Sequence, residues 1–304
     1  MLFRSELDGR GDQSFNDAAA AGLDKATSEL GIEAKELEAT GGEADSAKEE
    51  RLTLLATSGY NPVIAIGFAY EGAVKKVAAA NPDTHFAIID DDAATGDNIA
   101  NLVFAEEQGS FLVGAAAALK SKTGNVGFIG GVDVPLIHKF EAGFAAGAKA
   151  VKADIKVQIK YLTQPPDFSG FGDPAKGKTA AAGMYDSGAD VVYAAAGGSG
   201  GGVFEAAKAA KALAIGVDSD QYKTADPAVQ SVILTSMLKR VDVAVFDFIK
   251  SAAEDKFTAG VVRYDLAKDG VGYSTSGGAV DDIVSKLDDY KAKIISGEIV
   301  VPTK

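Results

Sequence analysis

Two stretches of the chain repeat one pattern, and this repeat limits the possible fold more than any other feature. They are NPVIAIGFAYEGAVKKVAAANPDTHFAIIDDD, residues 61–92, and ADVVYAAAGGSGGGVFEAAKAAKALAIGVDSD, residues 189–220. Each reads as an apolar strand, a short loop, a helix, a second apolar strand and a group of acids. The aspartates that close the second strands, Asp90 and Asp218, stand at the same place in each stretch. The repeat predicts two similar α/β halves, with chance similarity between two βαβ units as the alternative.

The same alternation of strands and helices extends along almost the whole chain. The predicted strands span residues 63–67, 86–89, 126–129, 156–161, 191–195 and 214–217. The predicted helices span residues 15–30, 45–58, 71–80, 108–119, 137–151, 175–187, 203–211, 241–254 and 280–295. Alternation of this kind is typical of parallel sheets that helices cover on both faces. A chain of 304 residues allows one large or two medium domains, and we expect the second half to begin near Lys122.

Composition narrows the classes of protein to which the chain can belong. Hydrophobic residues make up 47% of the sequence, so disorder is not expected. The net charge of -13 would repel nucleic-acid phosphates, and we expect no nucleic-acid partner. The absence of cysteine excludes disulfides, thiolate metal sites and a cysteine nucleophile. No apolar run approaches the roughly 18 residues of a transmembrane helix.

Acidic and glycine-rich segments follow several of the predicted strands. Residues 90–92 are three aspartates, Asp218 and Asp220 follow a later strand, and residues 194–202 read AAAGGSGGG. Ligands of open parallel sheets gather at the carboxyl ends of the strands, so these segments predict a ligand site. Two such edges facing one another would form an interdomain cleft.

An enzyme of hydrolysis or group transfer needs a nucleophile or a general base, and the chain offers little of either. Its two histidines, His85 and His138, stand in no recognisable triad, so we expect both to be structural. Residues 90–92 could bind magnesium through carboxylate oxygens, although a solvated strand end is the more common outcome. We therefore predict no catalytic residue, no metal and no cofactor.

Carboxylates at a strand edge also accept hydrogen bonds from hydroxyl groups, and one carboxylate can accept both hydroxyls of a vicinal diol. The glycines of residues 194–202 could instead cradle a phosphate, or serve only as a flexible loop. A site that carries Asp12, Asp90, Glu107 and Asp218 would repel an anion. A neutral sugar or nucleoside therefore fits best.

The segment GRGDQSFND, residues 9–17, precedes the first predicted helix. It departs from the dinucleotide-binding pattern because Ser14 replaces the third glycine and Asp12 adds a negative charge. An RGD adhesion site is not supported, since no disulfide-stapled loop surrounds it. Two interpretations remain. Asp12 or Ser14 caps the helix, or Phe15 and Asn16 offer a ring and an amide to a ligand.

Two further aromatic side chains precede a helix of the second half. Phe168 and Phe171 belong to the loop QPPDFSGFGDPAKG. A ring from this loop and the ring of Phe15 could sandwich a flat base, at roughly 1 to 3 kcal/mol per stacking contact. Burial in hydrophobic packing is the alternative for each of them.

Several motifs of the chain are similar to those of one family. They are DQSFND, FAEEQGSFLVGAAAALKSKTGNVGFIGGVDVPLIHKFEAGFAAGAK, FGDPAKGK, AAGGSGGGVFEAA, AIGVDSDQ and LTSMLKRVDVAV. In this order they resemble the basic membrane protein family, the purine nucleoside receptor-like substrate-binding lipoproteins of bacterial ABC importers. The resemblance runs from Gly9 to about Asp242 and weakens toward the end of the chain.

The resemblance implies an α/β fold of the type I periplasmic-binding-protein class, with two doubly wound parallel-sheet lobes joined by a hinge of crossing strands. The implied lobes are residues 1–121 with a returning segment near 240–262, and residues 122–239 with a returning segment near 263–304. The segment MLFRSELD departs from the family, whose members begin with an uninterrupted apolar strand.

The resemblance also implies a set of ligand contacts. They are Asp12, Phe15, Asn16, Asp90, Glu107, Phe171, Gly198, Asp218 and Lys239. Lys239 is expected at the end of a strand, where its ammonium could keep nearby carboxylates ionised or donate to a ribose oxygen. A surface lysine without a role is the alternative.

We therefore expect an extracytoplasmic, monomeric binding protein that captures a nucleoside, above all a purine nucleoside, and delivers it to ABC permease subunits without catalysis. The alternatives are a sugar or another small polar metabolite as ligand, a ligand-sensing domain, and a nucleoside- or sugar-modifying α/β enzyme. The full-length protein is expected to reach the membrane only through a lipid anchor, which this chain, without cysteine, does not carry.

Overall fold

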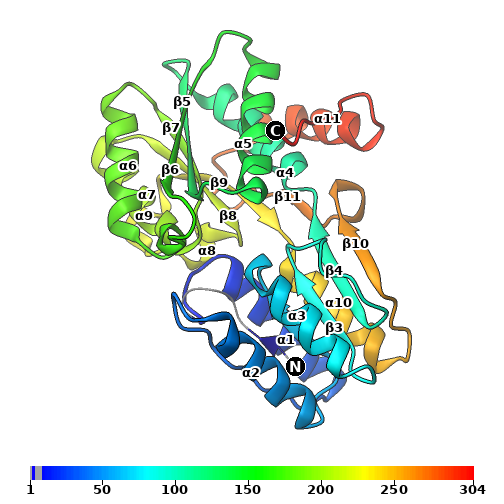
Figure 1. Ribbon diagram of the computed structural model, residues 1–304. Helices are drawn as coiled ribbons and strands as arrows, with labels where there is room; N and C mark the ends of the chain where they lie inside the picture. Colours follow the sequence, from blue (N-terminus) through cyan, green and yellow to red (C-terminus); the bar gives the residue numbers. More distant parts are fainter. Residues whose placement is uncertain (1, 4–8) are drawn as a thin grey trace. The chain divides into compact units, whose positions relative to one another are not determined.

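The structure is a computed structural model that describes residues 2–3 and 9–304 of the chain. Contacts between residues divide the chain into two compact units. The first contains Met1–Asp12, Asn16–Phe104 and Arg240–Tyr264, and the second contains Gln13–Phe15, Ala105–Lys239 and Asp265–Lys304. Each unit has its own sheet with helices on both faces (Figure 1), which confirms the predicted α/β class.

The first unit is built on a sheet whose neighbouring strands all run parallel within the described residues. In spatial order the strands are β1 (Leu2–Phe3), β2 (Val63–Ile66), β3 (Phe86–Ile89), β4 (Ile99–Phe104) and β10 (Gly260–Tyr264). The helices are α1 (Phe15–Leu30), α2 (Asp45–Thr57), α3 (Glu71–Ala80) and α10 (Val241–Ala253), with a 3-10 turn, η1 (Phe68–Tyr70), before α3. β2 and β3 are buried along their whole length because helices cover both faces of the sheet.

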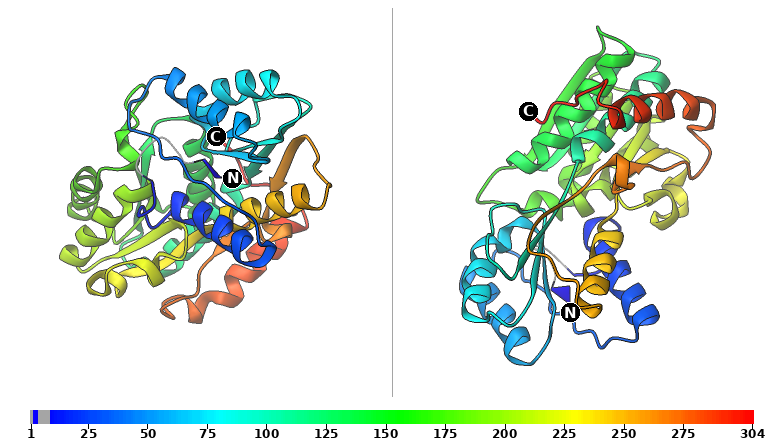
Figure 2. Two further views of the ribbon diagram at one scale, coloured as in Figure 1. Left: turned by 90° about the horizontal axis from the view of Figure 1, so that it is seen from below. Right: turned by 90° about the vertical axis from the view of Figure 1, so that its right-hand side faces the viewer.

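The two faces of this sheet are covered in different ways. The right-hand view of Figure 2 shows α2 and α3 on one face and α1 with α10 on the other. Leu52 of α2 packs with Val74 and Val77 of α3 in one apolar cluster. On the other face α1 approaches α10 closely at Gly22, where a Cβ would lie 2.4 Å from the carbonyl oxygen of Asp242.

The second unit is built on a longer sheet. In spatial order its strands are β11 (Val271–Tyr273), β9 (Ile233–Lys239), β8 (Leu213–Asp218), β7 (Val191–Ala195), β5 (Asn125–Val132) and β6 (Lys156–Thr163). Its helices are α4 (Glu106–Lys120), α5 (Pro135–Val151), α6 (Pro174–Asp186), α7 (Gly200–Ala210), α8 (Gln221–Thr224), α9 (Pro227–Gln230) and α11 (Val284–Ile295). Its 3-10 turns are η2 (Ser169–Phe171), η3 (Gly197–Ser199), η4 (Leu266–Lys268) and η5 (Asp281–Ile283). β11 pairs antiparallel with β9, and the other described pairs are parallel.

Within this unit, α6 and α7 cover one face of the sheet and α4 and α5 cover the other (Figure 1). The backbones of α4 and α5 come into near contact. A Cβ at Gly114 would lie 2.1 Å from the carbonyl oxygen of Phe144, and a Cβ at Gly143 would lie 2.1 Å from that of Glu107. This close packing places α4 in the second unit, whereas the lobe limits expected from the sequence put residues up to 121 in the N-terminal lobe.

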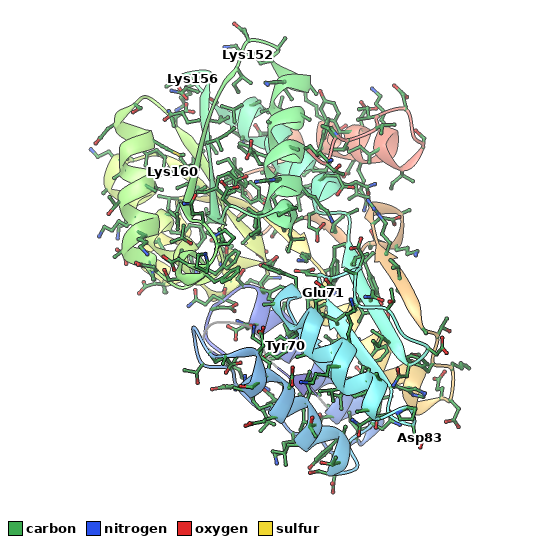
Figure 3. The ribbon with its side chains drawn as sticks, in the orientation of Figure 1. Tyr70, Glu71, Asp83, Lys152, Lys156 and Lys160 are labelled. Atoms are coloured by element: carbon green, nitrogen blue, oxygen red, sulfur yellow. The ribbon has the colours of Figure 1, made fainter. Side chains whose placement is uncertain are left out.

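Figure 3 labels residues on β6 of the second unit and around α3 of the first. Lys156 lies where the edge strand β6 begins, and Lys160 lies farther along it. Both are exposed, and lysines on an edge strand oppose pairing with another chain. In the first unit Tyr70 and Glu71 lie at the start of α3 and Asp83 lies beyond its end (Figure 3). Tyr70 and Glu71 therefore mark the carboxyl edge of that sheet, where β2 ends.

Every strand and helix predicted from the sequence is present, with small shifts at the ends. The last helix begins later than predicted because residues 281–283 form η5. β4, β9, β10 and β11 lie outside the predicted strands, although Lys239, which ends β9, was expected at the end of a strand. β1 pairs Leu2 with Ile64 and Phe3 with Ala65. The rest of MLFRSELD lies outside the described residues.

Candidate ligand-binding site

Asp218 is the last residue of β8, at the carboxyl edge of the second unit's sheet. Its φ of 63° is in the left-handed region, which aspartate tolerates better than most residues. The residue is 7% exposed, and its Oδ2 accepts a hydrogen bond from Ser14 Oγ at 2.7 Å. A buried carboxylate held in an uncommon conformation is typical of a ligand site.

Several hydrogen bonds fix the opening loop to this strand edge. Besides the Ser14–Asp218 bond, Ser219 Oγ donates to the carbonyl oxygen of Ser14 at 2.9 Å. Gln221 Nε2 donates to the carbonyl oxygen of Gln13 at 3.1 Å. Ser14 is fully buried. These hydrogen bonds hold the backbone immediately before Phe15 in place.

Lys239 ends β9 and is 2% exposed, so the alternative of a surface lysine is wrong. Its Nζ lies 4.9 Å from the ring centre of Phe15 and 5.6 Å from that of Phe140. The same ammonium lies 3.6 Å from Oε1 of Glu106. The structure thus brings together Phe15 and Lys239, two of the residues selected from the sequence.

Glu106 and Glu107 begin α4 and are 1% and 3% exposed. Glu107 was selected from the sequence, and its neighbour Glu106 forms an ion pair with Lys239. Oε2 of Glu106 also lies 3.6 Å from Nζ of Lys139. The motif FAEEQGSF drew attention to these two adjacent acids. Their different roles depend on tertiary packing, which the motif does not show.

Tyr193 of β7 reports on the charge at this edge. Its side chain is fully buried, and its hydroxyl lies 3.3 Å from Ser110 Oγ. Burial raises the pKa of this phenol well above its ordinary value, and the negative charges of Asp218 and Glu106 raise it further. The two carboxylates therefore act on a common region of the second unit.

Phe171 and Gly198 lie in neighbouring turns, η2 and η3, of the second unit. A Cβ at Gly131 would lie 2.4 Å from Cδ1 of Phe171, and Gly197 has a φ of 54°. Ser199 links the two turns, since it accepts from the Asp173 amide at 2.8 Å and donates to the Gly170 carbonyl at 2.7 Å. Within the glycine run the steric reason concerns Gly197, where a Cβ would lie 2.9 Å from the carbonyl oxygen of Phe171.

Asp12 caps α1 in the first unit. Its two carboxylate oxygens accept from the amides of Asn16 at 2.8 Å and Asp17 at 3.1 Å. In return Asp17 Oδ1 accepts from the amide of Gly11 at 2.8 Å. The capping interpretation is confirmed for Asp12, and it is wrong for Ser14, whose hydroxyl is directed to Asp218. Asn16 is 4% exposed.

Asp90 follows β3 at the carboxyl edge of the first unit's sheet. Its φ is 66°, its side chain is half-buried, and its amide donates to the carbonyl of Leu102 at 3.0 Å. The next acid, Asp91, accepts from the amides of Ala93 and Ala94. Over residues 2–3 and 9–304, no three Asp, Glu or His side chains are grouped in a way that could hold a metal ion.

The two histidines have other neighbours. His85 stacks on Phe257 at 4.0 Å between ring centres. His138 Nε2 lies 2.7 Å from Oδ1 of Asp133, and both side chains are exposed. Neither contact involves the residues described above.

Comparison with known proteins gives a consistent result. A family profile described as ABC transporter substrate-binding protein PnrA-like (Bmp) matches residues 6–304. The chain is 37% identical over 318 residues to the CD4+ T-cell-stimulating antigen of Listeria monocytogenes, which covers 99% of this chain and 87% of that protein. It is also 37% identical over 318 residues to the ABC transporter nucleoside-binding protein BmpA of Lactococcus lactis, with coverage of 99% and 88%.

A solved structure extends the similarity to the fold. The crystal structure of an ABC transporter solute-binding protein from Aeropyrum pernix K1 aligns with a TM-score of 0.82 and 31% identity, over 100% of this chain and 93% of that one. This confirms the expected type I periplasmic-binding-protein fold with two lobes, and the matching family and structure are solute-binding proteins, not enzymes. None of the helices in the described part of the chain has both the length and the apolar character to span a bilayer. The chain belongs to the Bmp family of ABC transporter substrate-binding proteins.

Proposed function

We propose that this chain captures a nucleoside, with purine nucleosides preferred, and delivers it to an ABC permease. The observation that carries the proposal is the pairing of Asp218 with the loop of Phe15. A buried carboxylate and an aromatic ring are the two groups that a ribose and a base require. Ser14 joins them through its 2.7 Å hydrogen bond to Asp218. The similarity to the nucleoside-binding protein BmpA of Lactococcus lactis supports the same ligand class.

The proposal assigns a specific role to three of the residues. Asp218 accepts hydrogen bonds from the ribose hydroxyls, Phe15 stacks on the base, and Lys239 donates to a ribose oxygen. The remaining contacts proposed in the second unit are Glu107, Phe171 and Gly198. Those proposed in the first unit are Asp12, Asn16 and Asp90. A purine is preferred over a pyrimidine because its larger ring system offers more area for stacking.

Isothermal titration calorimetry with a panel of ligands tests the proposal. The panel contains inosine, adenosine, guanosine, uridine, cytidine, hypoxanthine and free ribose. Loss of stacking costs roughly 1 to 3 kcal/mol per contact, so inosine should bind at least about tenfold more tightly than ribose. Equal affinity for ribose and inosine would instead favour a sugar-binding protein. Equal affinity for uridine and inosine would remove only the purine preference.

We also propose an extracytoplasmic location, with a lipid anchor on the full-length protein and a monomeric state. The family assignment supports the permease as partner. Reconstituting the cognate permease and its ATPase in liposomes tests this role, since the nucleoside-loaded protein should stimulate ATP hydrolysis and the empty protein should not. A ligand-sensing domain would bind the nucleoside and leave the ATPase unchanged.

A further inference from the structure

We propose that Glu106 is a positioning residue that holds Lys239 in place for the ligand. This inference rests on the proposed function, which assigns Lys239 to the ribose. Glu106 lies outside the contacts inferred from the family resemblance. The pair lies entirely within the second unit, with Glu106 at the start of α4 and Lys239 at the end of β9.

Burial makes a compensating charge necessary. Lys239 is 2% exposed and Glu106 is 1% exposed. Removing an ammonium from water is strongly unfavourable unless an opposite charge or hydrogen bonds compensate for the lost hydration. Glu106 Oε1 lies 3.6 Å from Lys239 Nζ, longer than an ordinary N–H···O hydrogen bond. The interaction between these two atoms is therefore electrostatic attraction without a hydrogen bond.

Two aromatic rings limit where the ammonium can lie. The ring centres of Phe15 and Phe140 are 4.9 Å and 5.6 Å from Lys239 Nζ, within the range of a cation–π interaction. The rings favour a cation without supplying a negative charge. Glu106 contributes a negative charge from the start of α4, 3.6 Å from the ammonium, so its loss should allow the ammonium to move relative to Phe15. The proposed stacking residue and the proposed ribose donor would then be disturbed together.

Glu106 is suited to this role because other groups stabilise its negative charge. It lies in the first turn of α4, where the helix dipole favours an anion. Its Oε2 also lies 3.6 Å from Nζ of Lys139, whose side chain is 32% exposed. Lys139 thus shares the carboxylate with Lys239 but lies nearer to solvent. This difference makes Lys139 a matched control.

A double-mutant cycle on nucleoside affinity separates positioning from general structural support. The variants are Glu106→Gln, Lys239→Met and the double variant, with inosine affinity measured by calorimetry. Each single change should weaken inosine binding by about tenfold or more, since a charge-assisted hydrogen bond is lost or misplaced. The double variant should bind about as weakly as Lys239→Met alone, because Glu106 acts only through Lys239. Lys139→Met should change the affinity by less than about twofold.

Glu106→Asp is a second variant in case Glu106→Gln folds poorly. It keeps the negative charge one methylene farther away, and its affinity should fall between those of the wild type and Lys239→Met. If Lys239→Met weakens binding and the Glu106 variants keep wild-type affinity, the inference is overturned and the proposed function stands. Additive losses in the double variant would also overturn it. If Lys239→Met itself keeps wild-type affinity, the proposed ribose contact fails with it.

Discussion

The two repeats of the chain end in aspartates with almost the same backbone conformation but different surroundings. Asp90 follows β3 with a φ of 66°, and Asp218 ends β8 with a φ of 63°. Asp90 is half-buried, whereas Asp218 is 7% exposed and bonded to Ser14. Each repeat also has a 3-10 turn between its first strand and its helix. The comparison indicates that the backbone places an acid at each strand edge, and that neighbouring side chains then give each acid its own properties.

The helix pairs beside these repeats differ more strongly. In the first unit Val74 of α3 packs against α2 with other large apolar side chains. Gly202 of α7 occupies the corresponding place in the second repeat, and a Cβ there would lie 1.8 Å from the carbonyl oxygen of Pro174. One pair of helices is thus held by apolar side chains and the other by close contact between backbones.

The largest expected effect comes from making the second helix pair resemble the first. Gly202→Val should lower the free energy of unfolding by about 3 kcal/mol, because its side chain meets the backbone of α6. Urea unfolding followed by circular dichroism measures the loss. Gly183→Ala is the control, since Gly183 is exposed on α6 and a Cβ there meets nothing within 4 Å. It should stabilise the chain by about 0.5 to 1 kcal/mol. An unchanged Gly202→Val protein would mean that α6 and α7 pack less closely than described.

The next largest effect is expected in ligand affinity and should differ between Asp218 and Asp90. Asp218→Asn keeps an acceptor for Ser14 and a residue that tolerates a positive φ, but it removes the charge. Inosine affinity should fall by about 10-fold to 100-fold, while affinity for hypoxanthine changes little. The matched Asp90→Asn should leave the ratio of the two affinities unchanged, because of these two aspartates only Asp218 is assigned to the ribose. A ratio that shifts equally in both variants would show that the ribose assignment is wrong.

Sequence patterns predicted β5, β7 and β8 of the second unit because these strands are buried and mostly apolar, whereas β9 and β11 of the same sheet lie outside the predicted strands. They did not indicate β10, whose first four residues alternate between half-buried and exposed positions beside β4. They also could not place α4. Its membership of the second unit depends on Gly143 and its neighbours in α5, and contacts so far apart in the sequence leave no local periodicity.

The residues of the candidate site could also be predicted only in part. The acids after the strands were predictable, because the carboxyl ends of parallel strands share one edge of a sheet. Capping by Asp12 or Ser14 was one of two interpretations of the opening loop, since both residue types are common caps, and only the fold brings Ser14 to Asp218. The choice between Glu106 and Glu107 depends on the rotation of α4 about its axis, which the sequence does not fix.

A smaller effect is expected from removing the hydrogen bond that Ser14 donates to Asp218. It tests whether the neighbours of Asp218 affect ligand binding. Ser14→Ala removes the 2.7 Å hydrogen bond to Asp218 and should reduce inosine affinity by about fivefold, equivalent to about 1 kcal/mol. Ser251→Ala is the matched control, because its hydroxyl bonds to Phe248 within α10. Calorimetry on both variants gives the comparison. Equal affinities would show that Asp218 is oriented without Ser14.

Asp91 and Asp220, the second acids of the two strand edges, have pKa values that are shifted in opposite directions. Burial raises the pKa of Asp91 above its ordinary value of 3.8. Burial also opposes ionisation of Asp220, but hydrogen bonds from Ser276, Lys223 and Ser274 outweigh it and lower the pKa. Asp220 therefore stabilises the fold above pH 3.8, and this contribution is lost as the pH falls further. The contribution of Asp91 is present at low pH and is lost as the pH rises through its raised pKa.

Asparagine variants at these two positions should give the smallest effect of the series. Asp220→Asn places an amide where Ser276 Oγ donates at 2.6 Å and should cost about 1 kcal/mol at pH 7, after allowance for partial solvent exposure. Asp91→Asn keeps an acceptor for the amides of Ala93 and Ala94 and should be neutral or slightly stabilising at pH 7. Urea unfolding at several values between pH 7 and pH 3 measures both. The cost of Asp220→Asn should shrink below pH 3.8, because the wild-type carboxylate then becomes protonated as well. If the cost stays constant over this range, the hydrogen bonds of Asp220 do not depend on its charge, and the two strand edges differ less than their surroundings indicate.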